Sequence, residues 1–256
     1  MIGALAGDII GSIYEFHNHK GLDIDLFSDM SGFTDDTVLT VALAEAILLK
    51  KPYVDLLKSY YFEYEDAGFG SMFYRWASSD NMQPYNSYGN GAAMRISPVG
   101  FAFNSLEEVL QKAELYTAVT HNHPEGIRGA QATAACIYWA RTGQTKEQIR
   151  AGVQERFGYA LNRTCDEIRP NYRFDETCQG SVPEAITAFL ESTSFENAIR
   201  LAVSLGGDSD TIACITGGMA QAFYGGVPAE IEALVEDRLT PELATVTAAF
   251  RKRYGC

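Results

Sequence analysis

Two short acidic motifs contain the side chains of this chain that are best suited to chemistry. Residues 34–37 read TDDT and residues 206–211 read GGDSDT, and each motif lies where a loop enters an apolar segment. Aspartate carboxylates and threonine hydroxyls are hard oxygen donors, which suit Mg²⁺, Mn²⁺ or Ca²⁺, whereas zinc sites favour His or Cys. The two motifs therefore indicate a site for hard divalent cations.

Helix capping is the alternative explanation, because Asp, Ser and Thr favour helix starts. A single aspartate at one helix start would need no further account. Adjacent carboxylates repel each other and only one can cap, so two at each of two starts require compensating positive charge. Together, Asp35, Asp36, Asp208 and Asp210 could hold two ions about 3.5–4 Å apart, a spacing that clamps hydroxyl or phosphate oxygens and orients a water.

A third segment, residues 85–91, reads YNSYGNG and has few core-forming side chains. Glycines let a backbone approach a ligand closely, Asn and Ser offer hydrogen-bond donors, and Tyr offers a stacking face. The segment is therefore a candidate ligand loop, with a plain surface turn as the alternative.

A fourth segment, residues 120–124, reads THNHP. Two histidines two residues apart do not share a helix face, so a two-histidine metal site is not indicated. His121 could instead donate a hydrogen bond to a phosphate or ribose oxygen.

A fifth segment near the N-terminus, residues 7–15, reads GDIIGSIYE. Gly7 and Gly11 are four residues apart, which predicts a helix that packs closely against a neighbour. Asp8 is interpreted as a structural hydrogen-bond acceptor, and Glu15 as a candidate carboxylate near the site.

Helical patterns dominate the elements that must position these residues. Apolar periodicity predicts helices over residues 34–50, 127–141 and 209–224. Capping-box spacing predicts four more helix starts, at Ser105, Thr145, Ser181 and Thr193. Residues 97–103 could be extended, but this run is short and contains a proline. The prediction is an all-α orthogonal multi-helix bundle.

Irregular segments are predicted over residues 66–95 and 162–182, and both are long enough to be functional loops. No linker or repeat divides the 256 residues, so a single domain over residues 1–256 is expected.

Composition excludes several functional classes. The chain has 20 basic and 33 acidic residues, a formal charge of −13, and its basic residues are scattered, which argues against an extended nucleic-acid surface. No long apolar run predicts a membrane span. The five cysteines are widely spaced with no CxxC pair, so a reducing cytoplasm is the expected location.

The five segments GDIIGSIYE, TDDT, SYGNGAAMR, THNHPEG and GGDSDT occur in one order over residues 7–211, and in this set the chain resembles the ADP-ribosylglycohydrolase family. The resemblance implies an all-helical fold with a binuclear Mg²⁺ centre, or Mn²⁺ in its place. It also implies a hydrolase that cleaves the glycosidic bond between ADP-ribose and a modified acceptor, either a protein or a small ADP-ribose conjugate.

The resemblance assigns roles residue by residue. The positions that match metal ligands are Thr34, Asp35, Asp36, Asp208, Asp210 and Thr211. Glu15 matches a glutamate on a mobile flap, and Glu15, Asp35 and Asp36 are the expected catalytic residues. The expected substrate-binding residues are Ser87, Tyr88, Gly89, Asn90, Gly91 and His121, with adenine stacked on Tyr88.

The motifs do not define the acceptor to which ADP-ribose is attached. An arginine-linkage enzyme of the family carries an aspartate where this chain has Ser87, and the motifs look closer to the subgroup that acts on serine-linked and poly-ADP-ribose. A catalytically silent ADP-ribose binder remains the alternative function. A prenyl-diphosphate synthase is disfavoured because the chain has no DDxxD motif, and a purely structural helical protein is the third possibility. Oligomeric state is left open.

Overall fold

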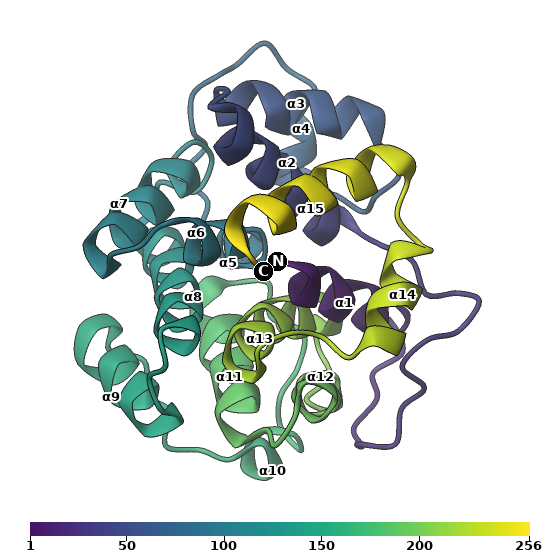
Figure 1. The fold of residues 1–256 in the computed structure, drawn as a ribbon, viewed down its shortest axis with the longest axis vertical. Helices are drawn as coiled ribbons and strands as arrows, with labels where there is room; N and C mark the ends of the chain where they lie inside the picture. Colours follow the sequence, from purple (N-terminus) through teal and green to yellow (C-terminus); the bar gives the residue numbers. More distant parts are fainter.

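The computed structural model describes all residues from 1 to 256 and consists almost entirely of helices (Figure 1). The only strand-like pairing is an isolated antiparallel bridge between Gly89 and Thr177. The helices are α1 (Ile2–Gly11), η1 (Ser12–Tyr14), α2 (Asp35–Leu49), α3 (Tyr53–Glu63), α4 (Ser71–Ala77), α5 (Gly91–Met94), α6 (Ser97–Ala102), α7 (Leu106–Thr117), α8 (Pro124–Arg141), α9 (Lys146–Phe157), α10 (Cys165–Ile168), α11 (Cys178–Glu191), α12 (Phe195–Ser204), α13 (Ser209–Tyr224), α14 (Ala229–Glu236) and α15 (Pro241–Tyr254). The predicted all-α class is confirmed.

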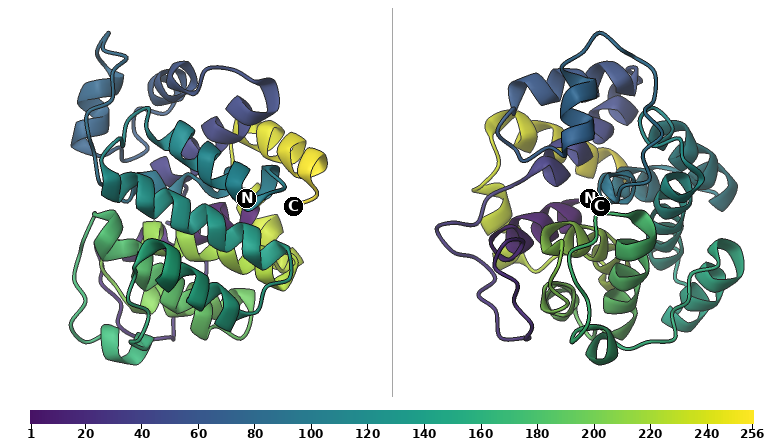
Figure 2. Two further views of the ribbon diagram at one scale, coloured as in Figure 1. Left: turned by 90° about the vertical axis from the view of Figure 1, so that its left-hand side faces the viewer. Right: turned by 180° about the vertical axis from the view of Figure 1, so that it is seen from behind.

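Helices α1 and α13 lie side by side at the centre of the bundle, and the other helices surround them (Figures 1 and 2). Every residue of α1 is buried, and a single cluster of 70 buried hydrophobic residues forms the core. A helix that is apolar on all sides is expected in such an interior position. The two ends of the chain lie near each other beside α1 (Figure 1).

Glycines on α1 allow the central helix pair to touch through backbone atoms. An ideal Cβ placed at Gly7 would lie 2.0 Å from the Ala213 carbonyl oxygen, and one at Gly11 would lie 2.5 Å from Asp210 Cα. No side chain larger than hydrogen fits at these distances. The predicted close packing is confirmed, and it brings the end of α1 against the start of α13.

Several predicted boundaries agree with the structure and others differ. Helix α13 spans the predicted residues 209–224, and Thr145 forms the full capping box expected before α9. Ser181, by contrast, lies inside α11, because Thr177 caps that helix one turn earlier. Residues 97–102 are helical rather than extended, with a proline at the first turn of α6, where its missing N–H costs nothing.

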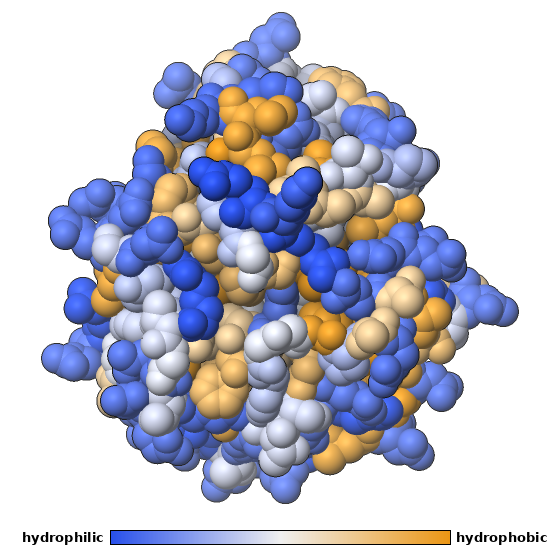
Figure 3. Space-filling model, in the orientation of Figure 1, coloured by the Kyte–Doolittle hydropathy of each residue, from blue (hydrophilic) through white to orange (hydrophobic).

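The predicted irregular segments contain short helices. Helices α4 and α5 lie within residues 66–95, and α10 lies within residues 162–182. No helix has both the length and the apolar character needed to cross a membrane. The face shown in Figure 3 is mostly polar, with small scattered groups of apolar side chains.

Candidate active site

The start of α2 is capped without its two aspartate side chains. Thr34 is the N-cap, and its hydroxyl accepts a hydrogen bond from Asp36 N at 3.2 Å. Asp8 of α1 accepts from Thr34 N at 3.0 Å, from the Thr34 hydroxyl at 2.7 Å and from Thr37 N at 3.0 Å. Asp8 therefore has the predicted structural role. The carboxylates of Asp35 and Asp36 remain available for another purpose.

The start of α13 is similar. Asp208 occupies the N-cap position but makes no capping hydrogen bond. Its Oδ2 instead accepts from Asn90 Nδ2 at 2.6 Å, and the same Nδ2 lies 3.0 Å from Ser181 Oγ. Asp210 accepts from Thr211 N at 2.9 Å. Capping alone therefore does not account for the acidic residues at either helix start.

The two motifs meet in space. Thr211 Oγ1 donates a hydrogen bond to Asp36 Oδ1 at 3.3 Å. Carboxylate oxygens of Glu15, Asp208 and Asp210 all lie within 4.8 Å of one another. The close packing of α1 on α13 explains this meeting. Asp8 lies on α1 and Glu15 directly follows η1, and the end of α1 contacts the second motif.

The segment that follows Glu15 is attached to the loop before α13. Asn18 Oδ1 accepts from Gly207 N at 2.8 Å. Lys20 Nζ donates to the Tyr172 carbonyl at 2.8 Å and also to the Leu205 carbonyl. These contacts hold the chain after Glu15 against the loop that carries Asp208.

Burial and mutual repulsion raise the pKa values of these carboxyl groups. Burial, followed by the charge of Asp8, raises the pKa of Asp35 and of Asp36 well above its usual range. Burial and the charge of Asp36 do the same for Asp210. Burial, with the charges of Asp208 and Asp8, raises the pKa of Glu15 to about 7. The folded site therefore favours neutralisation of its carboxylates by protons or cations.

The donors fit a pair of hard divalent cations. Asp36 Oδ2 is buried without a hydrogen-bond partner, which is rare for a carboxylate oxygen. Six residues from three parts of the chain supply oxygen atoms at the cavity, and no cysteine or histidine is among these donors: Glu15, Asp35, Asp36, Asp208, Asp210 and Thr211. Oxygen-only donor sets of this kind suit Mg²⁺ or Mn²⁺.

The predicted ligand loop is anchored on both sides. On one side, Asn86 N donates to Asn122 Oδ1 at 2.8 Å. On the other, Asn90 N donates to the Glu176 carbonyl at 2.7 Å and Cys178 N donates to the Tyr88 carbonyl at 2.9 Å. The loop therefore has a fixed backbone beside the acidic cluster.

Tyr88 and His121 differ in their exposure. The Tyr88 side chain is 46% exposed, and its ring centroid lies 5.1 Å from that of His123. His121 is buried, and its Nδ1 lies 2.8 Å from Arg95 Nη2 and 2.8 Å from Thr120 Oγ1. Burial, followed by the positive charge of Arg95, lowers the pKa of His121 well below its usual range.

All of the predicted site residues except Thr34 line one cavity of about 370 Å³. Thr34 lies behind this surface, where its hydroxyl joins Asp8 to the start of α2. Several other lining residues were not assigned a role from the sequence, among them Met72, Phe73, Arg95, Phe174 and Glu176. Arg95 stands within the SYGNGAAMR segment, but the others come from segments with no distinctive motif.

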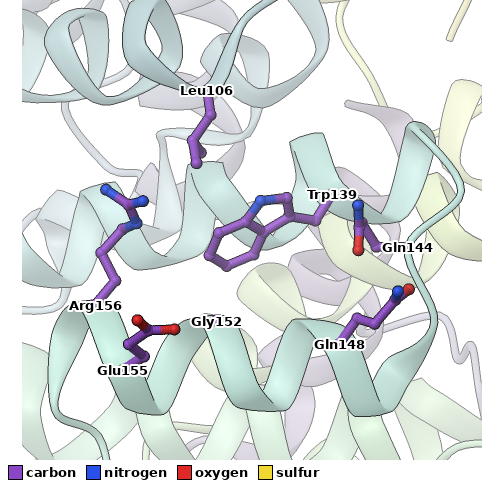
Figure 4. Close-up of a pocket in the computed structure, with 7 residues that line it drawn as sticks. All are labelled: Leu106, Trp139, Gln144, Gln148, Gly152, Glu155 and Arg156. Carbon is purple, nitrogen blue, oxygen red and sulfur yellow. The ribbon is translucent and has the colours of Figure 1, made fainter.

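A second hollow of about 420 Å³ lies between α8 and α9 and contains none of the predicted residues. Figure 4 shows the indole of Trp139 lying between the two helices. Glu155 and Arg156 lie on one side of the indole, and Gln144 and Gln148 lie on the other. An ideal Cβ at Gly152 would lie 2.9 Å from the Trp139 ring, so this indole packs directly on α9.

Comparison with known proteins identifies the family. A sequence model described as ADP-ribosylglycohydrolase matches residues 1–255. The chain belongs to the ADP-ribosylglycohydrolase family. This membership confirms the resemblance seen in the five motifs, and it makes the protein a glycohydrolase enzyme.

Relatives of this ADP-ribosylglycohydrolase have names that state different activities. ADP-ribosylhydrolase ARH3 of Mus musculus is 27% identical, over 88% of this chain and 82% of its own. ADP-ribosylarginine hydrolase Tri1 of Pseudomonas putida is 26% identical, over 90% of this chain and 71% of its own. A solved structure of an ADP-ribosylglycohydrolase-related protein complex shares the fold, with a TM-score of 0.71, 24% identity, and coverage of 98% of this chain and 95% of that chain.

Proposed function

We propose that residues 1–256 act as one metal-dependent hydrolase unit, which cleaves the glycosidic bond between ADP-ribose and a modified acceptor and releases ADP-ribose. The convergence of carboxylates from the segment after η1 and from the starts of α2 and α13 on one cavity is the observation that carries this proposal. Membership of the family and the names of the relatives support the substrate class.

The oxygen donors would hold two divalent cations, with Mg²⁺ preferred and Mn²⁺ as the alternative. Asp36 and Thr211 are already joined by a hydrogen bond, and Asp208 and Asp210 lie beside Glu15. Cations at this position would supply Lewis acidity, which lowers the pKa of water and balances negative charge. The structural hydrogen bonds of Asp8 and Asn90 would keep the ligating side chains in place.

The ligand loop and His121 would bind the ADP-ribose unit. Ser87, Tyr88, Gly91 and His121 line the cavity beside the acids, and the Ser87 hydroxyl, the Tyr88 and Gly91 backbone N–H groups and the His121 imidazole can donate to the diphosphate and ribose oxygens. The exposed ring of Tyr88 offers a face on which adenine can stack.

The carboxylates would assist bond cleavage directly. Hydrolysis joins the oxygen of a water molecule to the anomeric carbon, breaks the bond from that carbon to the acceptor, and leaves one proton for the acceptor atom. Positive charge develops on the ribose ring in the transition state, and neighbouring carboxylates stabilise such charge. Asp35 and Asp36 would orient the water, and Glu15, which also lines the cavity, would accept its proton.

A panel of defined substrates tests the proposal. ADP-ribose linked to serine, to arginine, to a nucleic-acid end and to an acetyl ester is incubated with the full chain in Mg²⁺, in Mn²⁺ and in EDTA. We expect release of free ADP-ribose from at least one substrate, with loss of release in EDTA. Binding of ADP-ribose without release from any of them would identify a silent binder instead.

A further inference from the structure

We propose that Arg95 is a positioning residue, which holds the His121 imidazole in the tautomer whose Nε2–H donates a hydrogen bond to substrate. Arg95 follows α5 directly, and His121 lies just before α8, so the contact joins two helix ends of the cavity. The inference rests on the proposed function, because it assigns the role of one group within the same site.

The contact geometry defines the tautomer. Arg95 Nη2 lies 2.7 Å from Thr120 Oγ1 and 2.8 Å from His121 Nδ1. A guanidinium group has donors only, so both neighbours must accept. His121 Nδ1 therefore presents its lone pair, and the ring proton of the neutral imidazole stands on Nε2. The Thr120 hydroxyl, 2.8 Å from Nδ1, can donate its own proton there as well.

The other ring nitrogen faces the ligand loop. His121 has hydrogen bonds at Nδ1 and none at Nε2, although the residue is buried. An ideal Cβ at Gly91 would lie 3.3 Å from Nε2, and one at Gly89 would lie 3.7 Å from it. Glycines at these two positions leave Nε2–H open to the cavity, where a diphosphate or ribose oxygen would accept.

Besides Thr120 and His121, Arg95 has two further neighbours: its guanidinium carbon lies 5.9 Å from the Phe73 ring centroid, and its charge partly offsets the rise that burial causes in the pKa of Asp35. Arg95 is 2% exposed, and no carboxylate lies within ion-pair distance of its guanidinium group. Burying a charge without a direct ion pair costs free energy, and neither Phe73 nor Asp35 accepts a hydrogen bond from the guanidinium. Arg95 Nη2 donates hydrogen bonds to both Thr120 Oγ1 and His121 Nδ1. Because the guanidinium group is planar, these two hydrogen bonds fix the imidazole in place, and this explains the position of Arg95.

The first measurement is the tautomer of His121 in the full chain without substrate. Protein labelled with ¹⁵N-histidine is studied by long-range ¹H–¹⁵N correlation at neutral pH, and the signals lost in His121→Gln assign the residue among the four histidines. We expect a single tautomer protonated at Nε2. A wild-type spectrum with Nδ1–H, or with a mixture of tautomers, would overturn the proposal whatever the variants do.

Two variants separate Arg95 from its neighbour. In Arg95→Met we expect a mixture of tautomers and a rise in KM that lowers kcat/KM about tenfold, with kcat nearly unchanged, since one oriented hydrogen bond is lost. In the near-isosteric Thr120→Val we expect the Nε2–H tautomer to persist, because Arg95 still donates. Loss of this tautomer in Thr120→Val but not in Arg95→Met would assign the role to Thr120 and contradict the proposal.

Arg156→Met is the matched control, because this arginine lies on α9 at the remote hollow (Figure 4). It should change neither the tautomer nor KM. Arg95→Lys keeps the positive charge but removes the planar guanidinium group. A mixture of tautomers in this variant supports positioning by the planar group. A wild-type tautomer and KM would show that the positive charge alone is enough to orient the imidazole. The tautomer is read without turnover, so a wild type that releases no ADP-ribose would refute the proposed function and leave this measurement intact.

Discussion

Thr211 Oγ1 donates a hydrogen bond to Asp36 Oδ1 across 3.3 Å, and this contact joins two acidic motifs whose residues lie 175 positions apart in the chain. The contact depends on the central helix pair, because α1 positions Asp8 beneath the first motif and touches the start of α13 through Gly11. The acids are thereby held together before any ligand arrives.

Divalent cations should stabilise the folded chain. A ligand at a hundred times its dissociation constant adds about 2.7 kcal/mol to the free energy of unfolding. For a protein of this size that corresponds to a rise in Tm of about 5–10 °C. Differential scanning fluorimetry in EDTA and in excess Mg²⁺ measures the effect. Asp210→Asn should lose most of the rise, and equal rises in both proteins would contradict a site at Asp210.

The effect of Mg²⁺ on Tm should depend on pH. The pKa values of Asp35, Asp36 and Asp210 are raised in the fold by burial and by neighbouring carboxylates. Protonation therefore stabilises the metal-free fold fully below the unfolded pKa of about 3.9, and this stabilisation is lost as pH rises through the higher folded values. In EDTA we expect Tm to fall from about pH 5 to about pH 8.

Mg²⁺ should offset this fall, because cations and protons compete for the same carboxylates. The rise in Tm on adding Mg²⁺ should therefore be larger at about pH 8 than at about pH 5. Thermal scans at matched ionic strength measure both values. A larger rise at the lower pH would show that the stabilising cation does not bind these acids.

Asp35→Ala should abolish release of ADP-ribose while leaving the fold nearly intact. The Asp35 carboxylate lines the cavity, and Thr34 and Asp8 cap α2 without it. We expect a loss of at least about a thousandfold in kcat, in line with the removal of a central electrostatic group. Asp237→Asn, at an exposed position after α14, is the matched control and should keep full activity. Full activity in Asp35→Ala would refute the mechanism.

Asn90 should affect cation affinity through Asp208. Its amide donates to Asp208 Oδ2 at 2.6 Å, and groups that orient a metal ligand typically contribute 10–100-fold in affinity. Asn90→Ala should therefore weaken Mg²⁺ binding by about tenfold or more, as measured by isothermal titration calorimetry. An unchanged dissociation constant would mean that Asp208 does not need this partner.

Gly7→Ala should destabilise the fold. Its new methyl group would lie 2.0 Å from the Ala213 carbonyl oxygen, which belongs to the backbone of α13 and cannot move aside cheaply. We expect a loss of about 3 kcal/mol in the free energy of unfolding, at the upper end for overpacking. Gly32→Ala, with no heavy atom within 4 Å of its ideal Cβ, should be nearly neutral. Similar urea unfolding midpoints for the two variants would contradict the close helix contact.

Local sequence patterns predicted much of the fold. Apolar periodicity located α2 and α13, because buried helices need continuous apolar surfaces, and glycine spacing predicted the close packing of α1. Capping signals were less exact. Ser181 has the expected spacing, yet Thr177 begins α11, since Asp175 and the bridge to Gly89 fix the chain there.

Local sequence patterns also predicted part of the candidate site. Residues within short motifs carried a local signal, and their side chains line the cavity. The roles of Arg95 and Asn90 carried none, because each depends on a partner from a distant segment: His121 for Arg95 and Asp208 for Asn90. Such contacts arise from helix packing, which residue spacing within one segment does not encode.

Anomalous diffraction from crystals grown with Mn²⁺ would show directly whether the two acidic motifs hold cations between them. We predict two manganese peaks in the cavity about 3.5–4 Å apart. Carboxylate oxygens of Asp36 and Asp210 should both lie within bonding distance of one or the other. The absence of manganese between these two residues in crystals grown at saturating Mn²⁺, or peaks only at other surface acids, would contradict a two-metal site formed by the two acidic motifs.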